Sequence, residues 1–181
     1  AAGDGLKSDN EDDATLGYVA IAGGAINVVA GGDAISAQTD VLITGGEFNL
    51  SAGGGSGAQV AADASAKGIK GLVNVLIDNG TFVIDAADDA IHSNGNITIN
   101  GGTFTLVTGD DGMHADAALT INGGAVTIPT SYEGLESAGI TINAGDIDVT
   151  SSDDGINVAG GADGSGAMAG PGRGGRGQGD P

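Results

Sequence analysis

The feature that most constrains the fold is a repeat of about 22 residues that carries the same apolar pattern each time. Each of six units has four apolar residues at alternating positions, two before a turn that contains glycine and two after it. The first of these positions recurs at residues 19, 41, 75, 97, 119 and 140, which gives steps of 22, 34, 22, 22 and 21 residues. Alternating apolar residues, many of them β-branched, predict strands with one buried face.

The constant step indicates the topology. Antiparallel hairpins would show the same alternation, but equivalent rows superpose only if successive coils climb one axis. We therefore expect an all-β fold, a right-handed parallel β-helix of about six to seven coils of about 22 residues, with neighbouring coils about 4.8 Å apart. An amyloid-like stack is the structural alternative, and six non-identical rows within one chain favour the solenoid.

A third short segment completes each coil and carries one apolar residue, at Leu6, Ile35, Ile69, Ile91, Met113, Leu135 and Ile156. The pattern predicts a β-helix domain over residues 1–160, with an insertion loop at 51–68 and a smaller insertion around 8–17. Loops that protrude from one position of a solenoid often carry its binding function. The alternative is a mobile Gly/Ala/Ser linker.

Composition excludes several classes of protein. The chain of 181 residues has 5 Lys+Arg against 24 Asp+Glu, a net charge of −19, so no nucleic-acid partner is expected. The absence of Cys excludes disulfides and thiolate metal sites. No apolar run approaches the roughly 18 residues that span a bilayer, so we expect no membrane insertion. No signal-peptide pattern begins at Ala1, so a secreted protein of this sequence would be a processed chain.

Acidic residues recur with the same period. The position two residues before the apolar residue of the third segment is occupied by Asp4, Asp33, Lys67, Asp89, Asp111, Glu133 and Asp154. A second acid precedes it at Asp88, Asp110 and Asp153. Stacking would place neighbouring charges about 5 Å apart, where two unit charges repel by roughly 3 kcal/mol at an effective dielectric constant near 20. The carboxylates must therefore splay into solvent, become protonated or share a cation.

Of these possibilities we favour a shared cation, and Ca²⁺ in particular. Carboxylate and backbone carbonyl oxygens suit Ca²⁺ better than Zn²⁺ or a transition metal. The predicted ligands centre on the 88/89 and 110/111 pairs and extend to the other acids of these columns. The run of Asp9, Asn10, Glu11, Asp12 and Asp13 is a second candidate, although such charge runs are commonly just solvated.

Two histidines, His92 and His114, occupy equivalent places 22 residues apart. We expect them to stack on an exposed strip beside the acids. A metal site with two histidines is the alternative, but the spacing fixes no third ligand. Lys67 and Lys70 flank one coil and are expected to form salt bridges with Asp33 or Asp89 of neighbouring coils.

Several motifs resemble those of a known family. They are GDGLKSDNEDD, SADDAIHSNGNITINGGTFTL, TGDDGMHADAALTINGG, and SYEGLES followed by SSDDGIN. In their order, spacing and inserted loops, residues 3–160 resemble a bacterial extracellular carbohydrate-binding family, long classed as a domain of unknown function. That resemblance implies a pectate-lyase-like right-handed parallel β-helix, binding of cellulose-like or pectin-like polysaccharide at the cell surface, and calcium at the Asp-Asp-Gly/Ala turns. Family domains extend further upstream and usually downstream, so any sugar-binding surface in those coils is not carried over.

The residues favour binding over catalysis. A pectate-lyase-type reaction needs a basic residue near calcium, and Lys7, Lys67 and Lys70 are the only basic residues before the tail. No Ser-His-Asp or Cys-His grouping is present, so we expect no enzyme. A polar ladder of Thr98, Thr120 and Thr141, with the two histidines, is the predicted polysaccharide surface. The absence of Trp argues against an aromatic sugar platform.

Self-association is the alternative function. A β-solenoid has unpaired strand edges at its ends, which need caps or partners. The tail at 161–181 is rich in glycine and carries Arg173 and Arg176, whereas the rest of the chain is strongly acidic. We expect this tail to dock on a neighbouring subunit, and head-to-tail contacts of that kind generate filaments. An extracellular fibre subunit and a polysaccharide binder are therefore both open, and one protein can be both.

Overall fold

The computed structural model describes residues 3–13, 15–61 and 64–159. The expectations for the tail at 161–181, and for Arg173 and Arg176 as docking residues, lie outside the described residues. None of the described segments is a helix long and apolar enough to span a bilayer.

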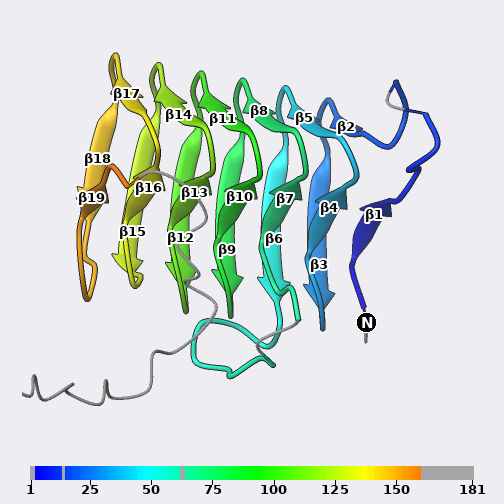
Figure 1. The fold of residues 1–181 in the computed structure, drawn as a ribbon, viewed down its shortest axis with the longest axis horizontal. Helices are drawn as coiled ribbons and strands as arrows, with labels where there is room; N and C mark the ends of the chain where they lie inside the picture. The colour runs from blue at the N-terminus through cyan, green and yellow to red at the C-terminus, as the bar shows by residue number, and fades with distance from the viewer. Residues whose placement is uncertain (1–2, 14, 62–63, 160–181) are drawn as a thin grey trace, which may run out of the picture.

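Within the described residues, nineteen strands form three parallel sheets that run side by side along the molecule (Figure 1). The sheet here named sheet A consists of β1 (Leu6–Ser8), β4 (Ile35–Ala37), β7 (Ile69–Gly71), β10 (Ile91–Ser93), β13 (Met113–Ala115), β16 (Leu135–Ser137) and β19 (Ile156–Asn157). Sheet B consists of β2 (Val19–Ile21), β5 (Asp40–Ile43), β8 (Asn74–Ile77), β11 (Asn96–Ile99), β14 (Ala118–Ile121) and β17 (Ile140–Ile142). Sheet C consists of β3 (Ala25–Ala30), β6 (Glu47–Ala52), β9 (Thr81–Ala86), β12 (Thr103–Thr108), β15 (Ala125–Thr130) and β18 (Asp146–Val149).

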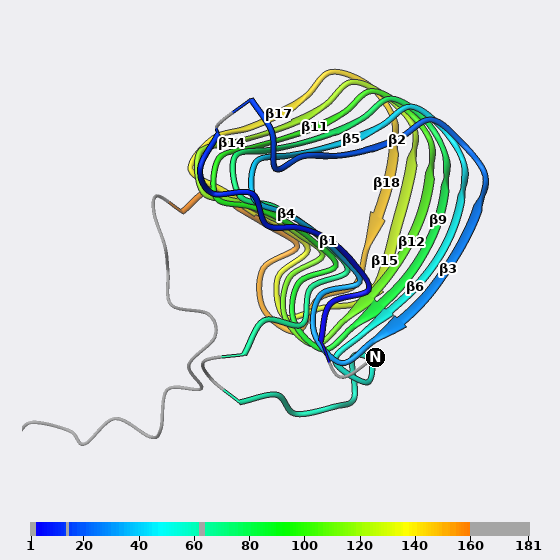
Figure 2. The same cartoon turned by 90° about the vertical axis from the view of Figure 1, so that its right-hand side faces the viewer.

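Every pairing is parallel and joins the same position of successive coils. Ile69 pairs with Ile91, and Ile91 pairs with Met113. Seen from the N-terminal end, the chain turns clockwise as it recedes from the viewer, so the coil is right-handed (Figure 2). The predicted all-β parallel solenoid is confirmed, and antiparallel ribbons are excluded among the described strands.

The inward side chains of the three sheets form one apolar core. Phe48, Phe82 and Phe104 stack with ring centroids 4.6 Å apart, close to the spacing of strands in a sheet. On sheet B, branched aliphatic side chains repeat coil by coil in a column of their own, as Ile43, Ile77, Ile99 and Ile121 do. Each fully buried side chain of this size contributes roughly 1.5 to 3 kcal/mol to folding. The chain thus builds a core with few aromatic residues by using the same aliphatic set in every coil.

Glycine is required at the turn between sheets B and C. Gly46, Gly80, Gly102, Gly124 and Gly145 all have positive φ there, between +100° and +143°. A Cβ added at Gly124 would lie 2.7 Å from the Gly102 carbonyl oxygen of the coil beneath. The recurring glycines of the sequence therefore let the backbone turn while coils stack closely.

Sheet A differs from the other two in the shape it gives the coil. Figure 2 shows the cross-section indented along β1 and β4, whereas sheets B and C form the outer sides. The insertion predicted at 51–68 starts later in the structure, because Ser51 and Ala52 still belong to β6. The inserted residues leave the coil between β6 and β7, and their far end returns beside sheet A, where Ser65 Oγ donates a hydrogen bond to Asp33 Oδ1 at 2.7 Å. The indentation is where the acidic and histidine positions lie.

Candidate functional site

Two columns of polar residues run along the outer side of sheet A. The acid column occupies the turn before each strand and consists of Asp4, Asp33, Lys67, Asp89, Asp111, Glu133 and Asp154. The central column occupies the second position of each strand, three residues later, and consists of Lys7, Ser36, Lys70, His92, His114, Glu136 and Asn157. Because the strands pair in register, each residue lies directly beside its equivalent in the next coil.

Both columns are buried over the middle coils, which corrects one expectation. The acids lie on the outer side of sheet A, yet Asp89 and Asp111 are 1% and 0% exposed. The histidines were expected on an exposed strip, yet His92 and His114 are 8% and 6% exposed. All three residues of β10, β13 and β16 are buried. The reason is the indentation of sheet A, because outward side chains on a concave face cover one another.

The acids are stabilised in a way that the sequence analysis did not consider. A carboxylate of one coil accepts a hydrogen bond from the backbone N–H of the equivalent residue in the next coil. Asp33 N–H donates to Asp4, Lys67 N–H to Asp33, Asp111 N–H to Asp89 and Glu133 N–H to Asp111, at 2.8 to 3.1 Å. Hydrogen bonds to a carboxylate favour its charged form. The column therefore joins neighbouring coils, and repulsion is offset by these amide donors.

Lys67 is the one basic residue in the acid column and places its ammonium group between two carboxylates. Its Nζ donates to Asp88 Oδ1 at 2.8 Å and to Asp89 Oδ2 at 2.6 Å. Burial by itself would lower the pKa of Lys67, but the charges of Asp89 and Asp88 outweigh it and raise that pKa. Lys70 Nζ lies 3.9 Å from Asp33 Oδ2. The predicted salt bridges of Lys67 with Asp89 and of Lys70 with Asp33 are thus confirmed.

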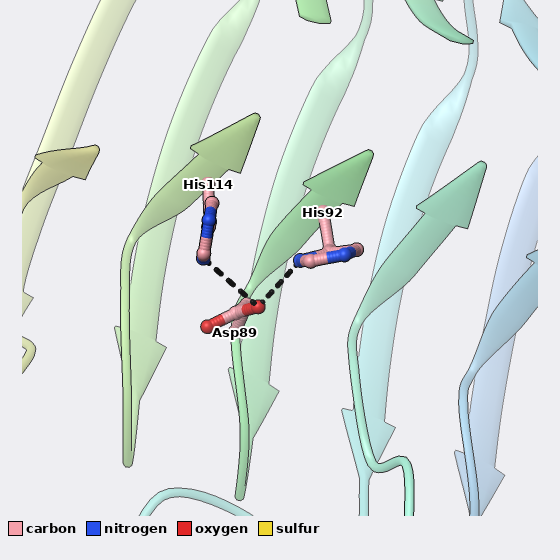
Figure 3. A group of neighbouring side chains, drawn as sticks. All are labelled: Asp89, His92 and His114. Atoms are coloured by element: carbon pink, nitrogen blue, oxygen red, sulfur yellow. Dashed lines mark hydrogen bonds and ion pairs between the residues drawn. The ribbon is translucent and has the colours of Figure 1, made fainter. Parts of the chain in front are cut away.

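The two histidines meet at Asp89 (Figure 3). His92 Nδ1 lies 2.8 Å from Asp89 Oδ2, and His114 Nδ1 lies 4.0 Å from the same oxygen. Burial favours the neutral carboxyl of Asp89, but Lys67 and His92 outweigh it and hold the pKa of Asp89 well below its ordinary value. Burial would also lower the pKa of His114, but Asp111, Asp89 and Glu136 raise it to about 9.

Among the described residues, three groups bring three possible ligand atoms within 4.8 Å of one another and could hold a metal ion. They are Asp88, Asp89 and Asp110; Asp89, His92 and His114; and Asp111, His114 and Glu136. Three of the predicted metal ligands, Asp88, Asp89 and Asp110, are thus brought together, and a fourth, Asp111, lies in a different group with His114 and Glu136. The other predicted ligands, Asp4, Asp33, Glu133, Asp153 and Asp154, lie outside these groups. The acidic run at 9–13 is exposed, and Asn10 Oδ1 accepts the N–H groups of Asp12 and Asp13.

The predicted threonine ladder exists but lies on sheet B, away from the histidines. Thr98, Thr120 and Thr141 pair in register on β11, β14 and β17. Thr141 is exposed, and the other two are half-buried. The structure therefore divides the predicted polysaccharide surface between two different sheets.

A polar pocket opens on the outer side of sheet A at β1, β4 and β7. It has a volume of about 310 Å³, and its lining includes Asp4, Lys7, Asp33, Ser36, Gln38 and Lys70. Lys7 Nζ lies 3.3 Å from Asp4 Oδ2, and Lys70 Nζ donates to Ser65 Oγ at 3.2 Å. Leu72, which is 39% exposed, adds an apolar wall. The pocket thus offers donors, acceptors and a small apolar surface side by side.

Sequence reasoning missed Glu136 and the pocket residues Ser36, Gln38 and Ser65. A signal for Glu136 was present, because it follows His114 by 22 residues, as His114 follows His92. Gln38 and Ser65 carry no periodic signal, since one lies in a connection and the other in the insertion.

Comparison with known proteins adds an independent finding. A family model described as "Carbohydrate-binding domain-containing protein" matches residues 1–112, more than half of the chain. No match was found among curated proteins or among solved structures. The matched stretch contains the whole lining of the pocket on β1, β4 and β7. The parallel solenoid with its polar pocket therefore belongs to this carbohydrate-binding domain-containing family.

Proposed function

We propose that this protein binds polysaccharide without catalysing a reaction, and that the pocket on β1, β4 and β7 holds the sugar. The observation that carries the proposal is the pocket's content of cations. The described part of this strongly acidic chain has three basic side chains, Lys7, Lys67 and Lys70, and two of them line one pocket. Paired Asp and Lys groups donate and accept hydrogen bonds as sugar hydroxyls require, while Leu72 offers a surface to the apolar face of a ring.

The two ammonium groups favour a pectin-like polysaccharide over a cellulose-like one. A uronate carboxylate would take the place of Asp4 at Lys7 or of Asp33 at Lys70, whereas a neutral glucan has no charge to match. The chain as a whole has a net charge of −19 and repels a polyanion. We therefore infer that recognition of an acidic glycan depends on this pocket.

Calorimetric titration with oligogalacturonate and with cello-oligosaccharides tests the proposal. Lys70→Gln should weaken binding of oligogalacturonate by about 10-fold, as expected for loss of one charge-assisted hydrogen bond. Thr120→Ala on sheet B serves as the matched control and should leave affinity unchanged. Binding that is lost in the threonine variant and kept in the lysine variant would move the site to sheet B. Absence of binding to both sugars would overturn the proposal.

The environment of Lys67, which lies outside the pocket, argues against a catalytic role for that residue. A lysine that removes a proton from a uronate must release its own proton readily, and its pKa must be lowered for that. The pKa of Lys67 is instead raised by Asp89 and Asp88. The proposal therefore assigns no catalytic base.

We also propose that calcium binds at Asp88, Asp89 and Asp110. This group offers carboxylate oxygens alone, the ligand type that Ca²⁺ prefers. Burial and the charges of Asp89, Asp111 and Asp88 raise the pKa of Asp110 to about 8, so negative charge here exceeds what Lys67 neutralises. Millimolar Ca²⁺ should raise the Tm of the wild-type protein and leave that of Asp110→Asn unchanged. A Tm indifferent to both Ca²⁺ and EDTA would contradict this site.

Self-assembly into a filament is the second candidate function. In the described residues, the core positions of the terminal coils are exposed, as at Leu6 (37%), Ile142 (42%) and Ile156 (49%), although their equivalents in the middle coils are fully buried. Stacking of a second copy would cover them. Electron micrographs should then show fibres, and Arg173→Glu combined with Arg176→Glu should leave folded monomers. Unchanged fibres in that variant would remove the docking role of the tail.

We propose an extracellular or cell-surface location, because pectin-like polysaccharides occur there. Fractionation of cells that produce the full-length protein would test it.

A further inference from the structure

We propose that Asp111, His114 and Glu136 bind a divalent transition-metal ion of the Zn²⁺ type, at a site separate from the carbohydrate pocket and from the proposed calcium site. The three side chains come from two adjacent coils. Asp111 lies in the turn before β13, His114 at the centre of β13 and Glu136 at the centre of β16. All three are buried, and their ligand atoms lie within 4.8 Å of one another.

The distances between these atoms suit a metal better than a hydrogen bond. His114 Nδ1 lies 3.4 Å from Asp111 Oδ2 and 3.5 Å from Glu136 Oε2. Hydrogen bonds between nitrogen and oxygen are typically about 2.7 to 3.2 Å long. In a tetrahedral zinc site with metal–ligand distances of about 2.0 to 2.2 Å, neighbouring ligand atoms are about 3.3 to 3.6 Å apart. The two separations from His114 Nδ1 match edges of such a tetrahedron.

Asp111 supplies a second observation. It is fully buried, and its two oxygens have different environments. Oδ1 accepts the backbone N–H of Glu133 at 3.0 Å, which fixes the carboxylate. Oδ2 has no hydrogen-bond partner among the described residues and is directed toward His114. A buried carboxylate oxygen without a donor is costly, and a bound cation would satisfy it.

The donor set indicates the class of metal. One imidazole nitrogen with two carboxylate oxygens suits Zn²⁺ and related ions, whereas Ca²⁺ and Mg²⁺ prefer oxygen alone. Two carboxylates and a neutral imidazole also balance the charge of a divalent ion. His114 Nε2 lies 3.5 Å from Asp116 Oδ1, and an outer carboxylate in that place orients a histidine that binds metal through its other nitrogen.

The neighbouring coil shows why the ion is assigned to this group. In the Asp89, His92 and His114 group, Asp89 Oδ2 already contacts Lys67 Nζ at 2.6 Å and His92 Nδ1 at 2.8 Å. Asp89 Oδ2 is thus already occupied by two donors and is the poorer ligand for a transition-metal ion. At the equivalent level of the next coil the sequence has no lysine, and the metal would take its place and join β13 to β16.

Titration of the EDTA-treated full chain with Zn²⁺, and with Co²⁺ followed by visible absorption, tests the site. The wild-type protein should bind one equivalent and give the strong visible bands of tetrahedral Co²⁺. Asp111→Asn, His114→Gln and Glu136→Gln should each cost more affinity than Asp116→Asn, for which a loss of roughly 10- to 100-fold is expected of an outer partner. Excess Ca²⁺ should not displace the ion.

His92→Gln is the matched control, because His92 contacts Asp89 and belongs to the other histidine group. It should leave Zn²⁺ affinity unchanged, and a large loss would place the ion at Asp89 instead and overturn the assignment. A ligand variant that fails to fold leaves the wild-type titration as the test. Absence of Zn²⁺ and Co²⁺ binding to the folded, EDTA-treated wild-type protein would overturn the proposal.

Discussion

The threonine ladder of sheet B and the central column of sheet A differ in burial. Both point outward from the solenoid, and both repeat with the same period in the sequence. Thr98 and Thr120 are half-buried and Thr141 is exposed, whereas His92, His114 and Glu136 are buried. Sheet B forms an outer side of the coil and sheet A lines its indentation (Figure 2). Alternation thus separates inward from outward side chains, but the curvature of the sheet decides whether an outward side chain meets water or its neighbours.

The largest loss of stability is expected when one buried acid of sheet A is removed. Asp89→Ala deletes the carboxylate that accepts hydrogen bonds from Lys67 Nζ and from the Asp111 N–H. Leaving a buried charge without its partner costs about 3 to 5 kcal/mol of unfolding free energy. Thr120→Ala, the matched change on sheet B, should cost less than about 0.5 kcal/mol. Unfolding in urea measures the free-energy change of each variant. Equal losses in the two variants would contradict the difference between sheet A and sheet B.

A second test uses pH, since the polar outer side of sheet A carries titrating groups and the threonine ladder does not. The pKa of Asp110 is raised from 3.8 to about 8 and that of His114 from 6.5 to about 9. Between each pair of values the folded protein binds more protons than the unfolded chain. The stability from Asp110 is therefore present below about pH 4 and lost as the pH rises to about 8. That from His114 is lost between about pH 6.5 and 9.

The EDTA-treated protein should accordingly unfold at lower urea concentration as the pH rises from neutral to alkaline. Asp110→Asn should flatten the profile between about pH 4 and 8 and leave the loss attributed to His114. Thr120→Ala should keep the wild-type profile. A wild-type stability that increases between about pH 4 and 8 would contradict the raised pKa of Asp110.

The smallest loss of stability is expected in a third column, whose asparagine side chains are exposed yet hydrogen-bonded to one another. At the corner after sheet B, Asn122 Nδ2 donates to Asn100 Oδ1 at 2.8 Å, and Asn143 Nδ2 donates to Asn122 Oδ1 at 2.7 Å. Asn122→Ala breaks both bonds and should cost about 1 kcal/mol, since each exposed bond contributes little net free energy. Asn49→Ala, on the exposed side of β6, should cost less than about 0.5 kcal/mol. Equal costs would show that the ladder contributes nothing.

The core was predictable residue by residue, while the site was predictable only in part. Inward positions such as Ile99 and Phe104 follow from period-two alternation and the step of 22 residues. The salt bridges of Lys67 and Lys70 followed from the same stacking. The burial of His92 was not predicted, because the curvature of sheet A arises from the lengths and angles of all three sides of the coil. The backbone donors to Asp89 and Asp111 were not predicted either, because they depend on where the turn directs each N–H group.

The sequence by itself determined that equivalent residues stack, which residues face the core and which acids, lysines and histidines share a column. Local periodicity carries that information, because a parallel solenoid repeats its sequence in space. Only the tertiary structure decided that one face is concave, that its polar residues are buried, and that Glu136 joins Asp111 and His114. Those properties depend on how three sheets close into a coil, and no single repeat contains them.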